Sequence, residues 1–187
     1  FNATAADLSI RAIWSMATCD QGKQATAADA IGAISQAMST HGAHAAVVHA
    51  GSGAFREIGS TPALRQRIAE ANGITAVIMA LARHGPNVQV ATLALGALWT
   101  ITVSQTLHKK CCELGVISAV VSTMNSHWSS EDLVGNGLAV LCNVLATEEL
   151  YHKYHSNDVD DMVRRARQSF PGSSIIKDCA DSILRVP

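Results

Sequence analysis

Three histidines recur at a constant spacing, and they are the first residues that suggest chemistry. His41, His84 and His127 are separated by 43 residues each, and imidazole is a common metal ligand. If each histidine belongs to one unit of a helical stack, neighbouring rings lie about 10 Å apart. Metal ligands lie about 2 Å from their ion, so these rings cannot share one. We therefore expect each ring to close a helix by bonding its free carbonyl groups.

The cysteines are the second set of candidates, for redox or metal chemistry. They are Cys19, Cys111, Cys112, Cys142 and Cys179. Their number is odd and no pair has the C-x-x-C spacing, so neither a disulfide framework nor a zinc site is predicted. We expect Cys111 to pack as a small hydrophobic residue. Such cysteines favour a reducing compartment, so a cytoplasmic location is predicted, with the nucleus or the cilium as alternatives.

No motif of catalysis or cofactor binding accompanies these residues. The sequence has no G-x-S-x-G, H-E-x-x-H, Walker or Rossmann glycine pattern, so it predicts no enzyme, no cofactor and no metal. The net charge of −1 predicts no nucleic-acid partner. No apolar run approaches the roughly 18 residues that a membrane span requires. With 48% hydrophobic and 16% charged residues, the chain has the composition of a folded domain.

The elements that carry these residues are revealed by an internal repeat. Residues 30–38 (AIGAISQAM), 73–81 (GITAVIMAL) and 116–124 (VISAVVSTM) align without gaps at a spacing of 43 residues. A weaker fourth copy follows 42 residues later. Each period contains a short helix, a middle helix of about ten residues and a longer third helix, with no β alternation. The sequence therefore predicts an all-α chain built from units at 19–61, 62–104, 105–147 and 148–187.

The two ends of this array are expected to differ. Residues 1–18 form only a third helix, whose Ile10, Ile13 and Trp14 would lie exposed without a preceding unit. We expect the chain to be a fragment of a longer array, and to self-associate through residues 1–18. At the other end, Asp161 and Arg165 replace small residues of the earlier units, which predicts that 148–187 is a C-terminal cap.

The repeat resembles the armadillo family. NGITAVIMAL (72–81) and GVISAVVSTM (115–124) resemble the family's GGI-x-x-LV-x-LL opening, and LVGNGLAVLCNVLA (133–146) resembles its VQ-x-x-A-x-x-AL-x-NLA third helix. The M-x-x-H ending of the second helix resembles the form found in some kinase-associated and ciliary armadillo domains. The resemblance spans nearly the whole chain and implies a single domain, 1–187, folded as a right-handed superhelical α-solenoid.

The resemblance also implies a binding surface. Third helices of armadillo repeats line a concave groove, where an asparagine on each helix clamps the backbone of a bound peptide. Asn143 is the residue here that matches this position, and the tryptophan that nuclear import adaptors place one turn earlier is absent. Small residues on the same helices would suit close approach of a partner helix or domain. The groove candidates are Glu57, Thr92, Gly96, Thr100, Gly135, Ala139 and Asn143.

Trp128 is a further candidate, either as an exposed anchor for a partner or as a side chain folded over the edge of its unit. Together these features predict a scaffold that binds a protein or peptide on its third-helix surface. An intramolecular regulatory or structural module of a larger protein is the alternative, and a transport adaptor is a third hypothesis. A plain solvated concave surface is the interpretation without a partner.

Overall fold

The computed structural model describes residues 2–25 and 28–185, and all regular structure in these two ranges is helical, as predicted. The helices are α1 (Ala3–Met16), α2 (Asp20–Ala25), α3 (Ala28–Thr40), α4 (Ala45–Ile58), α5 (Pro62–Glu70), α6 (Gly73–His84), α7 (Val88–Thr102), the 3-10 helix η1 (Gln105–Leu107), α8 (His108–Glu113), α9 (Val116–Ser126), α10 (Glu131–Val144), α11 (Glu148–Tyr154), α12 (Asn157–Ser169) and α13 (Ser174–Ile183). No single helix among the described residues is long and apolar enough to cross a membrane; two sharply bent helix pairs meet that test by length and composition alone.

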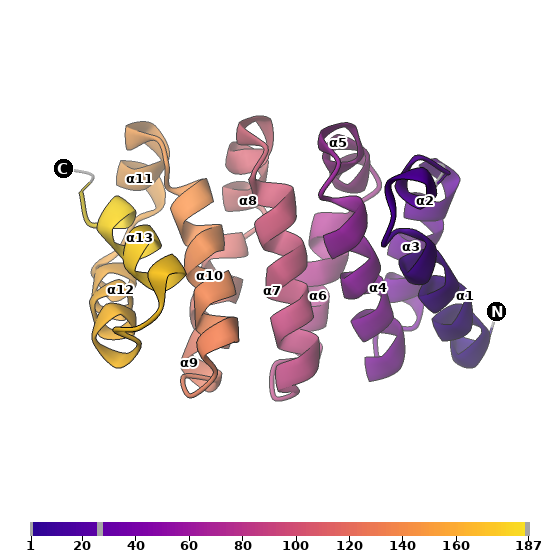
Figure 1. Ribbon diagram of the computed structural model, residues 1–187, viewed down its shortest axis with the longest axis horizontal. Helices are drawn as coiled ribbons and strands as arrows, with labels where there is room; N and C mark the ends of the chain where they lie inside the picture. The colour runs from indigo at the N-terminus through magenta and orange to yellow at the C-terminus, as the bar shows by residue number, and fades with distance from the viewer. Residues whose placement is uncertain (1, 26–27, 186–187) are drawn as a thin grey trace.

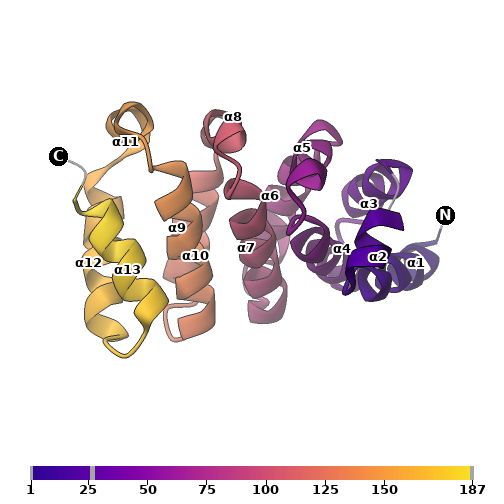
Figure 2. The ribbon, with the colours of Figure 1, turned by 45° about the horizontal axis from the view of Figure 1, so that its top comes forward.

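The helices are arranged in rows, and the helices of one row are not consecutive in the sequence (Figure 1). The long helices α1, α4, α7, α10 and α13 form one row, in which each helix packs against the next. Behind them α3 packs against α6, and α6 against α9. The short helices α5, α8 and α11 lie along one edge of both rows, which Figure 2 brings forward. A short, a middle and a long helix therefore recur in the same order along the molecule.

Helix boundaries follow from local side-chain chemistry. Asn87 caps α7, because its Oδ1 accepts hydrogen bonds from the backbone N–H groups of Gln89 (3.1 Å) and Val90 (3.2 Å). The turns that lead into α6 and α9 use a left-handed residue, Asn72 with φ of 61° and Gly115 with φ of 82°. Glycine and asparagine are the residues that adopt this conformation most readily.

The apolar columns of the repeat form one continuous core. Phe55, Leu98 and Leu141, which occupy one column of the third helices, are fully buried, and Ile183 of the same column is 2% exposed. All four side chains belong to one cluster of buried apolar residues, so the core runs through the whole row.

Within a unit, facing side chains of the middle and long helices complement one another in size. Met38 of α3 fills the space above Gly51 of α4, where an added Cβ atom would lie 2.4 Å from its Sδ. Met124 of α9 fills the space above Gly137 of α10 in the same way, with 2.5 Å between the added Cβ and Sδ. The unit between them carries a leucine, Leu81, and an alanine in these columns. In these three units, a large side chain of the middle helix thus corresponds to a small residue of the long helix.

Between units, the histidine column bonds backwards along the array. Nε2 of His84 lies 2.7 Å from the carbonyl oxygen of Gly42, and His127 makes the same bond to Gly85. The prediction that each ring closes its own helix was therefore wrong. The carbonyl group belongs to the turn that follows the preceding middle helix, so the bond joins two successive units. His41 makes no side-chain hydrogen bond among the described residues.

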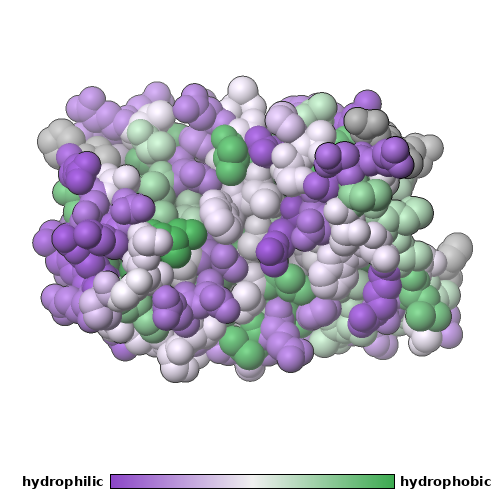
Figure 3. Space-filling model, in the orientation of Figure 1, coloured by the Kyte–Doolittle hydropathy of each residue, from purple (hydrophilic) through white to green (hydrophobic). Residues whose placement is uncertain are grey.

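The N-terminal edge is apolar, although not through the residues that the sequence suggested. Ile10 is 3% exposed, and Trp14 packs edge-on against His49 of α4, with ring centroids 5.7 Å apart. The expectation that Ile10 lies exposed was wrong, and Trp14 is only partly exposed because one side of its ring contacts α4. The open surface is a groove of about 310 Å³ between α1 and α3, whose lining includes Ile13 and Ala33. Hydrophobic residues gather at this end in Figure 3.

The C-terminal end is charged. Arg167 of α12 lies 2.8 Å from Asp181 of α13, and Arg164 lies 3.9 Å from Asp160. Arg165, which the sequence suggested as part of an outer face, instead lies over the ring of Trp128, 3.9 Å from its centroid. Its column faces the preceding unit, so the charged surface of this end comes from other positions. Figure 3 shows the hydrophilic residues gathered there.

The methionine–glycine pairing predicts a specific coupling. Replacing Gly137 with Ala should destabilise the protein by about 1 kcal/mol, since overpacking against Met124 outweighs the gain in helix propensity. The double variant G137A/M124L recreates the pair found in the middle unit and should recover the wild-type free energy of unfolding. Urea unfolding of the four proteins of the cycle measures the coupling, expected at about 1–3 kcal/mol. Additive effects of the two substitutions would contradict the pairing.

The N-terminal groove predicts self-association. At high concentration the chain should form dimers or larger species, because burying this apolar groove removes its lining from water. Static light scattering across a concentration series should show a rising mass for the wild type and a constant monomer mass for Ala33→Glu. Ala82→Glu, which adds the same charge at an exposed position of α6, is the matched control and should associate like the wild type. A wild-type protein that stays monomeric throughout would refute this prediction.

Candidate binding face of the third helices

The long helices present one continuous side of the molecule, which we call the third-helix face. It is the side of α1, α4, α7, α10 and α13 that faces the viewer in Figure 1. Figure 3 shows the same side as a mixture of hydrophilic residues and separate hydrophobic ones. The groove candidates inferred from the sequence differ in how exposed they are on this face.

The small residues of the long helices are covered by the chain itself. A Cβ atom added at Gly53 would lie 2.4 Å from the ring of Trp14, and one at Gly96 would lie 3.3 Å from Cδ of Arg56. At Gly135 the added atom would meet Ile175 of α13 at 3.4 Å. The side chain of a neighbouring helix therefore occupies each of these spaces.

Three of the predicted groove residues are consequently inaccessible. Gly96, Gly135 and Ala139 are buried. The expectation that small residues form the floor of a binding groove was wrong. They allow the long helices to approach one another, so their role is in packing.

Asn143 is used to join two helices. Its Nδ2 donates to Oγ1 of Thr102 at 3.2 Å and approaches the carbonyl oxygen of Trp99 at 3.5 Å. Asn136, one heptad earlier on α10, donates from Nδ2 to the carbonyl oxygen of Thr92 at 3.3 Å. Two asparagines thus tie α10 to carbonyl groups of α7. The side-chain N–H groups of Asn143 are therefore already engaged, and only its Oδ1 stays free for a peptide.

The remaining polar candidates are partly exposed. The hydroxyl of Thr92 donates to the carbonyl oxygen of Val88 at 2.8 Å, and that of Thr100 donates to Ala97 at 2.9 Å. Glu57 lies 4.0 Å from Nε of Arg56. Because both threonine hydroxyls give their hydrogen to their own helix, they can offer a partner only an acceptor.

Trp128 lies away from the third-helix face. It follows α9, and its Nε1 donates to Oγ of Ser169 on α12 at 3.2 Å while Arg165 covers its ring. Of the two alternatives that the sequence left open, the structure shows the side chain folded over the edge of its unit. The ring holds α12 to the preceding unit.

One accessible part of the face is a hollow between α1 and α7. It has a volume of about 490 Å³ and is lined by Trp14 and His49 together with Val88, Gln89, Thr92 and Leu93. His49 is the residue of α4, the helix between these two, that lines the hollow. Thr92 is the groove candidate from the sequence that lines it.

Further along α7, two large apolar side chains are open to solvent. Trp99 is 37% exposed and Val103 is 49% exposed, on the same side of the helix. The repeat alignment placed Trp99 outside the expected groove, so it was not among the candidates. The signal in the sequence that could have identified Trp99 is a tryptophan at a position that is not one of the buried apolar columns of the repeat.

The histidine that lines the hollow, His49, favours its neutral form. Burial lowers the pKa of His49, and the nearby Arg11 guanidinium lowers it further, against the smaller raising effect of Asp7. Arg11 and Asp7 form an ion pair on α1, with Nε and Oδ1 2.8 Å apart. A neutral His49 therefore offers a partner an uncharged imidazole beside the ring of Trp14.

Two cysteines that are distant in the sequence meet where α10 packs on α13. The pKa of Cys142 falls to about 7 because the thiol of Cys179 donates a hydrogen bond to it, while burial acts in the opposite direction. The pKa of Cys179 is raised by the same contact. Cys111, by contrast, is fully buried as expected, and burial raises its pKa to about 12.

In the described ranges, no group of three or more histidine, cysteine or acidic side chains is placed to hold a metal ion. No model of a known protein family matches the chain, and no curated protein sequence is significantly similar to it. The geometry of this chain is therefore the basis for assigning its function.

The partly buried His49 predicts a dependence of stability on pH. Its pKa in the folded protein lies below the ordinary value, so the unfolded chain binds a proton that the folded protein does not. The free energy of unfolding should therefore fall as pH drops through the ordinary histidine range near 6.5. Urea unfolding at pH 7.5 and 5.5 should show a smaller loss for His49→Gln than for the wild type. The exposed His44 provides a control substitution, His44→Gln. Equal losses in wild type and His49→Gln would contradict the assignment.

The cysteine contact predicts selective reactivity. Iodoacetamide at pH 7.5 should modify Cys142 much faster than Cys111, because the thiolate is the reactive form and Cys111 is both buried and protonated. Mass spectrometry of the digested protein gives the rate at each site. Cys179→Ala removes the hydrogen-bond donor and should slow the modification of Cys142. Cys19→Ser removes an exposed thiol elsewhere and should leave that rate unchanged.

Proposed function

We propose that this chain is an armadillo-type α-solenoid that works as a non-catalytic scaffold, binding a protein or peptide on its third-helix face. The fold part of the proposal is supported by the recurrence of a short, a middle and a long helix, and by the stacking of like helices in rows. The function part is supported by one observation above all. Trp99 stands 37% exposed in the middle of the row of long helices.

An exposed tryptophan at that place is suited to protein recognition. Tryptophan buries a large apolar area on binding and is enriched among the residues that dominate interface energies. Trp99 lies on α7 together with part of the lining of the hollow, and Val103 directly follows this helix. A bound segment that runs along α7 would therefore meet an aromatic anchor, an apolar neighbour and a recess.

The accessible residues favour a partner with apolar anchors. Val88, Leu93 and Trp14 line the hollow, and His49 within it is neutral. Two cationic side chains lie near these residues: Arg56 lies against Gly96 and close to Glu57, and Arg11 is paired with Asp7. A reducing compartment, the cytoplasm with the nucleus or cilium as alternatives, is part of the proposal because all five cysteines are free thiols.

An intramolecular module of a larger protein is the second candidate, and one observation favours it. His41 lines the N-terminal groove, whereas His84 and His127 bond a carbonyl group of the preceding unit. The side of α3 that carries His41 and lines this groove is therefore equivalent to the sides of α6 and α9 that contact the preceding unit. A further unit could pack against it in the same way.

The test compares two exposed apolar side chains of equal accessibility. Trp99 and Leu114 are each 37% exposed, and Leu114 lies at the end of α8. Proteins captured on the immobilised wild type should be lost by at least tenfold with Trp99→Ala and retained with Leu114→Ala, with circular dichroism confirming that both variants fold. Partners retained equally by both variants would place binding elsewhere and overturn the proposal.

A further inference from the structure

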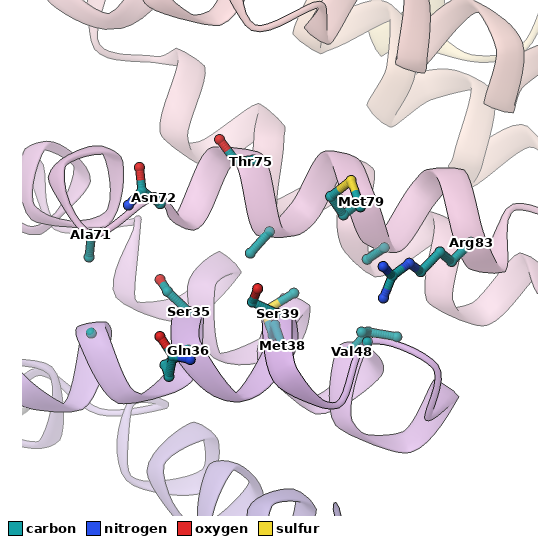
Figure 4. A pocket seen from close by; sticks show the side chains of 14 residues that line it. Ser35, Gln36, Met38, Ser39, Val48, Ala71, Asn72, Thr75, Met79 and Arg83 are labelled. Carbon is teal, nitrogen blue, oxygen red and sulfur yellow. The ribbon is translucent and has the colours of Figure 1, made fainter.

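A second cavity lies between the middle helices α3 and α6, behind the third-helix face. It has a volume of about 190 Å³, whereas a single water molecule needs about 15 Å³ of such space. Figure 4 shows the side chains of both helices around it. The lining contains polar groups from α3, from α6 and from the turn that precedes α6. The space is therefore large enough for a polar ligand group rather than for solvent alone.

Ser35 is the most informative residue of this lining. It is 5% exposed, and its hydroxyl has no hydrogen-bond partner among the described residues. A buried hydroxyl without a partner is costly, and serine in a helix usually bonds a carbonyl group of the preceding turn. The next two units carry Ile78 and Val121 at the equivalent positions. One unit therefore replaces an apolar side chain with a donor that points into the cavity, as Figure 4 shows.

Arg83 lies at the other end of the same cavity. Its guanidinium points into the gap between α3 and α6 in Figure 4, and it makes no ion pair or side-chain hydrogen bond among the described residues. Gly42 leaves room for it, because a Cβ atom there would lie 2.5 Å from Nη1 of Arg83. The equivalent residues of the neighbouring units are Thr40 and Ser126, which are uncharged. The cation is thus specific to this cavity.

The other polar residues of the lining carry hydroxyl and amide groups, and Nε2 of Gln36 already donates one hydrogen bond to Oγ1 of Thr40 at 3.0 Å. Ser39 and Gln36 come from α3, Thr75 comes from α6, and Asn72 precedes it. No carboxylate lines the cavity. A set of hydroxyl and amide donors with one guanidinium and no anion is suited to a ligand group with several acceptor oxygens and negative charge.

We propose that this cavity between α3 and α6 binds a phosphate monoester group. A phosphate has three terminal oxygens and close to two negative charges, so it can accept from the hydroxyls and the guanidinium together. A carboxylate has two oxygens and a single charge, and satisfies fewer of these donors. The phosphate belongs either to a small molecule or to a phosphorylated side chain of a partner. The site is independent of the third-helix face and of the function proposed for it.

The experiment is a titration of the ¹⁵N-labelled protein, followed by NMR, with three probes. These are inorganic phosphate, glycerol phosphate and a blocked Gly-phosphoserine-Gly peptide, with acetate as the carboxylate comparison. Saturable shifts should centre on the amides of Ser35, Ser39 and Thr75. Arg83→Gln should weaken phosphate binding at least tenfold. Arg67→Gln, which removes an exposed charge from α5, should leave it unchanged.

A second variant tests the site without changing its charge. Ser35→Val places in the cavity a side chain like those of the neighbouring units, so it should abolish binding while the thermal midpoint rises or stays constant. Tighter binding of glycerol phosphate points to a small molecule, and tighter binding of the phosphoserine peptide points to a partner protein; both support the site. Absence of saturable shifts in the folded wild type, acetate binding as tight as phosphate, or binding that survives Ser35→Val would each overturn the proposal.

Discussion

The contact between successive long helices is the interaction on which the rest of this structure depends. The helices approach closely because each contact has a position without a bulky side chain, which a neighbour then fills: Trp14 covers Gly53, and Arg56 covers Gly96. Close approach places Phe55, Leu98 and Leu141 in one uninterrupted apolar column. Dispersion and hydrophobic burial accumulate along that column, so stability is distributed over many equivalent contacts.

This packing decides which residues are left for binding. A side chain that joins two helices cannot also join a partner, and the glycines and Asn143 are used in this way. The accessible groups are those that the packing leaves partly exposed, such as Trp99, or those that border a recess, such as His49 and Thr92. Function on the third-helix face is therefore concentrated on α7 and on its junction with α1.

Departures from the repeat are the clearest indication of function elsewhere in the molecule. A repeated unit supplies its own comparison, because equivalent positions experience nearly equivalent surroundings. Ser35 stands where the neighbouring units have Ile78 and Val121, and Arg83 stands where they have short neutral side chains. At the position of Ser35, packing alone favours the apolar residues, since a buried hydroxyl without a partner costs free energy. Two such departures converging on one cavity suggest selection for a ligand.

The sequence by itself determined the period, the helical class, the turns at Asn72 and Gly115, and the core column of Leu98 and Leu141. These features depend on local periodicity and backbone preference, which every unit expresses separately. Only the tertiary structure decided whether Gly96 lies under a neighbour or open to solvent, which carbonyl group His84 bonds, and that Cys142 meets Cys179. A repeat shows which positions are equivalent, but the rotation of each helix and the neighbour it faces are set by packing between units.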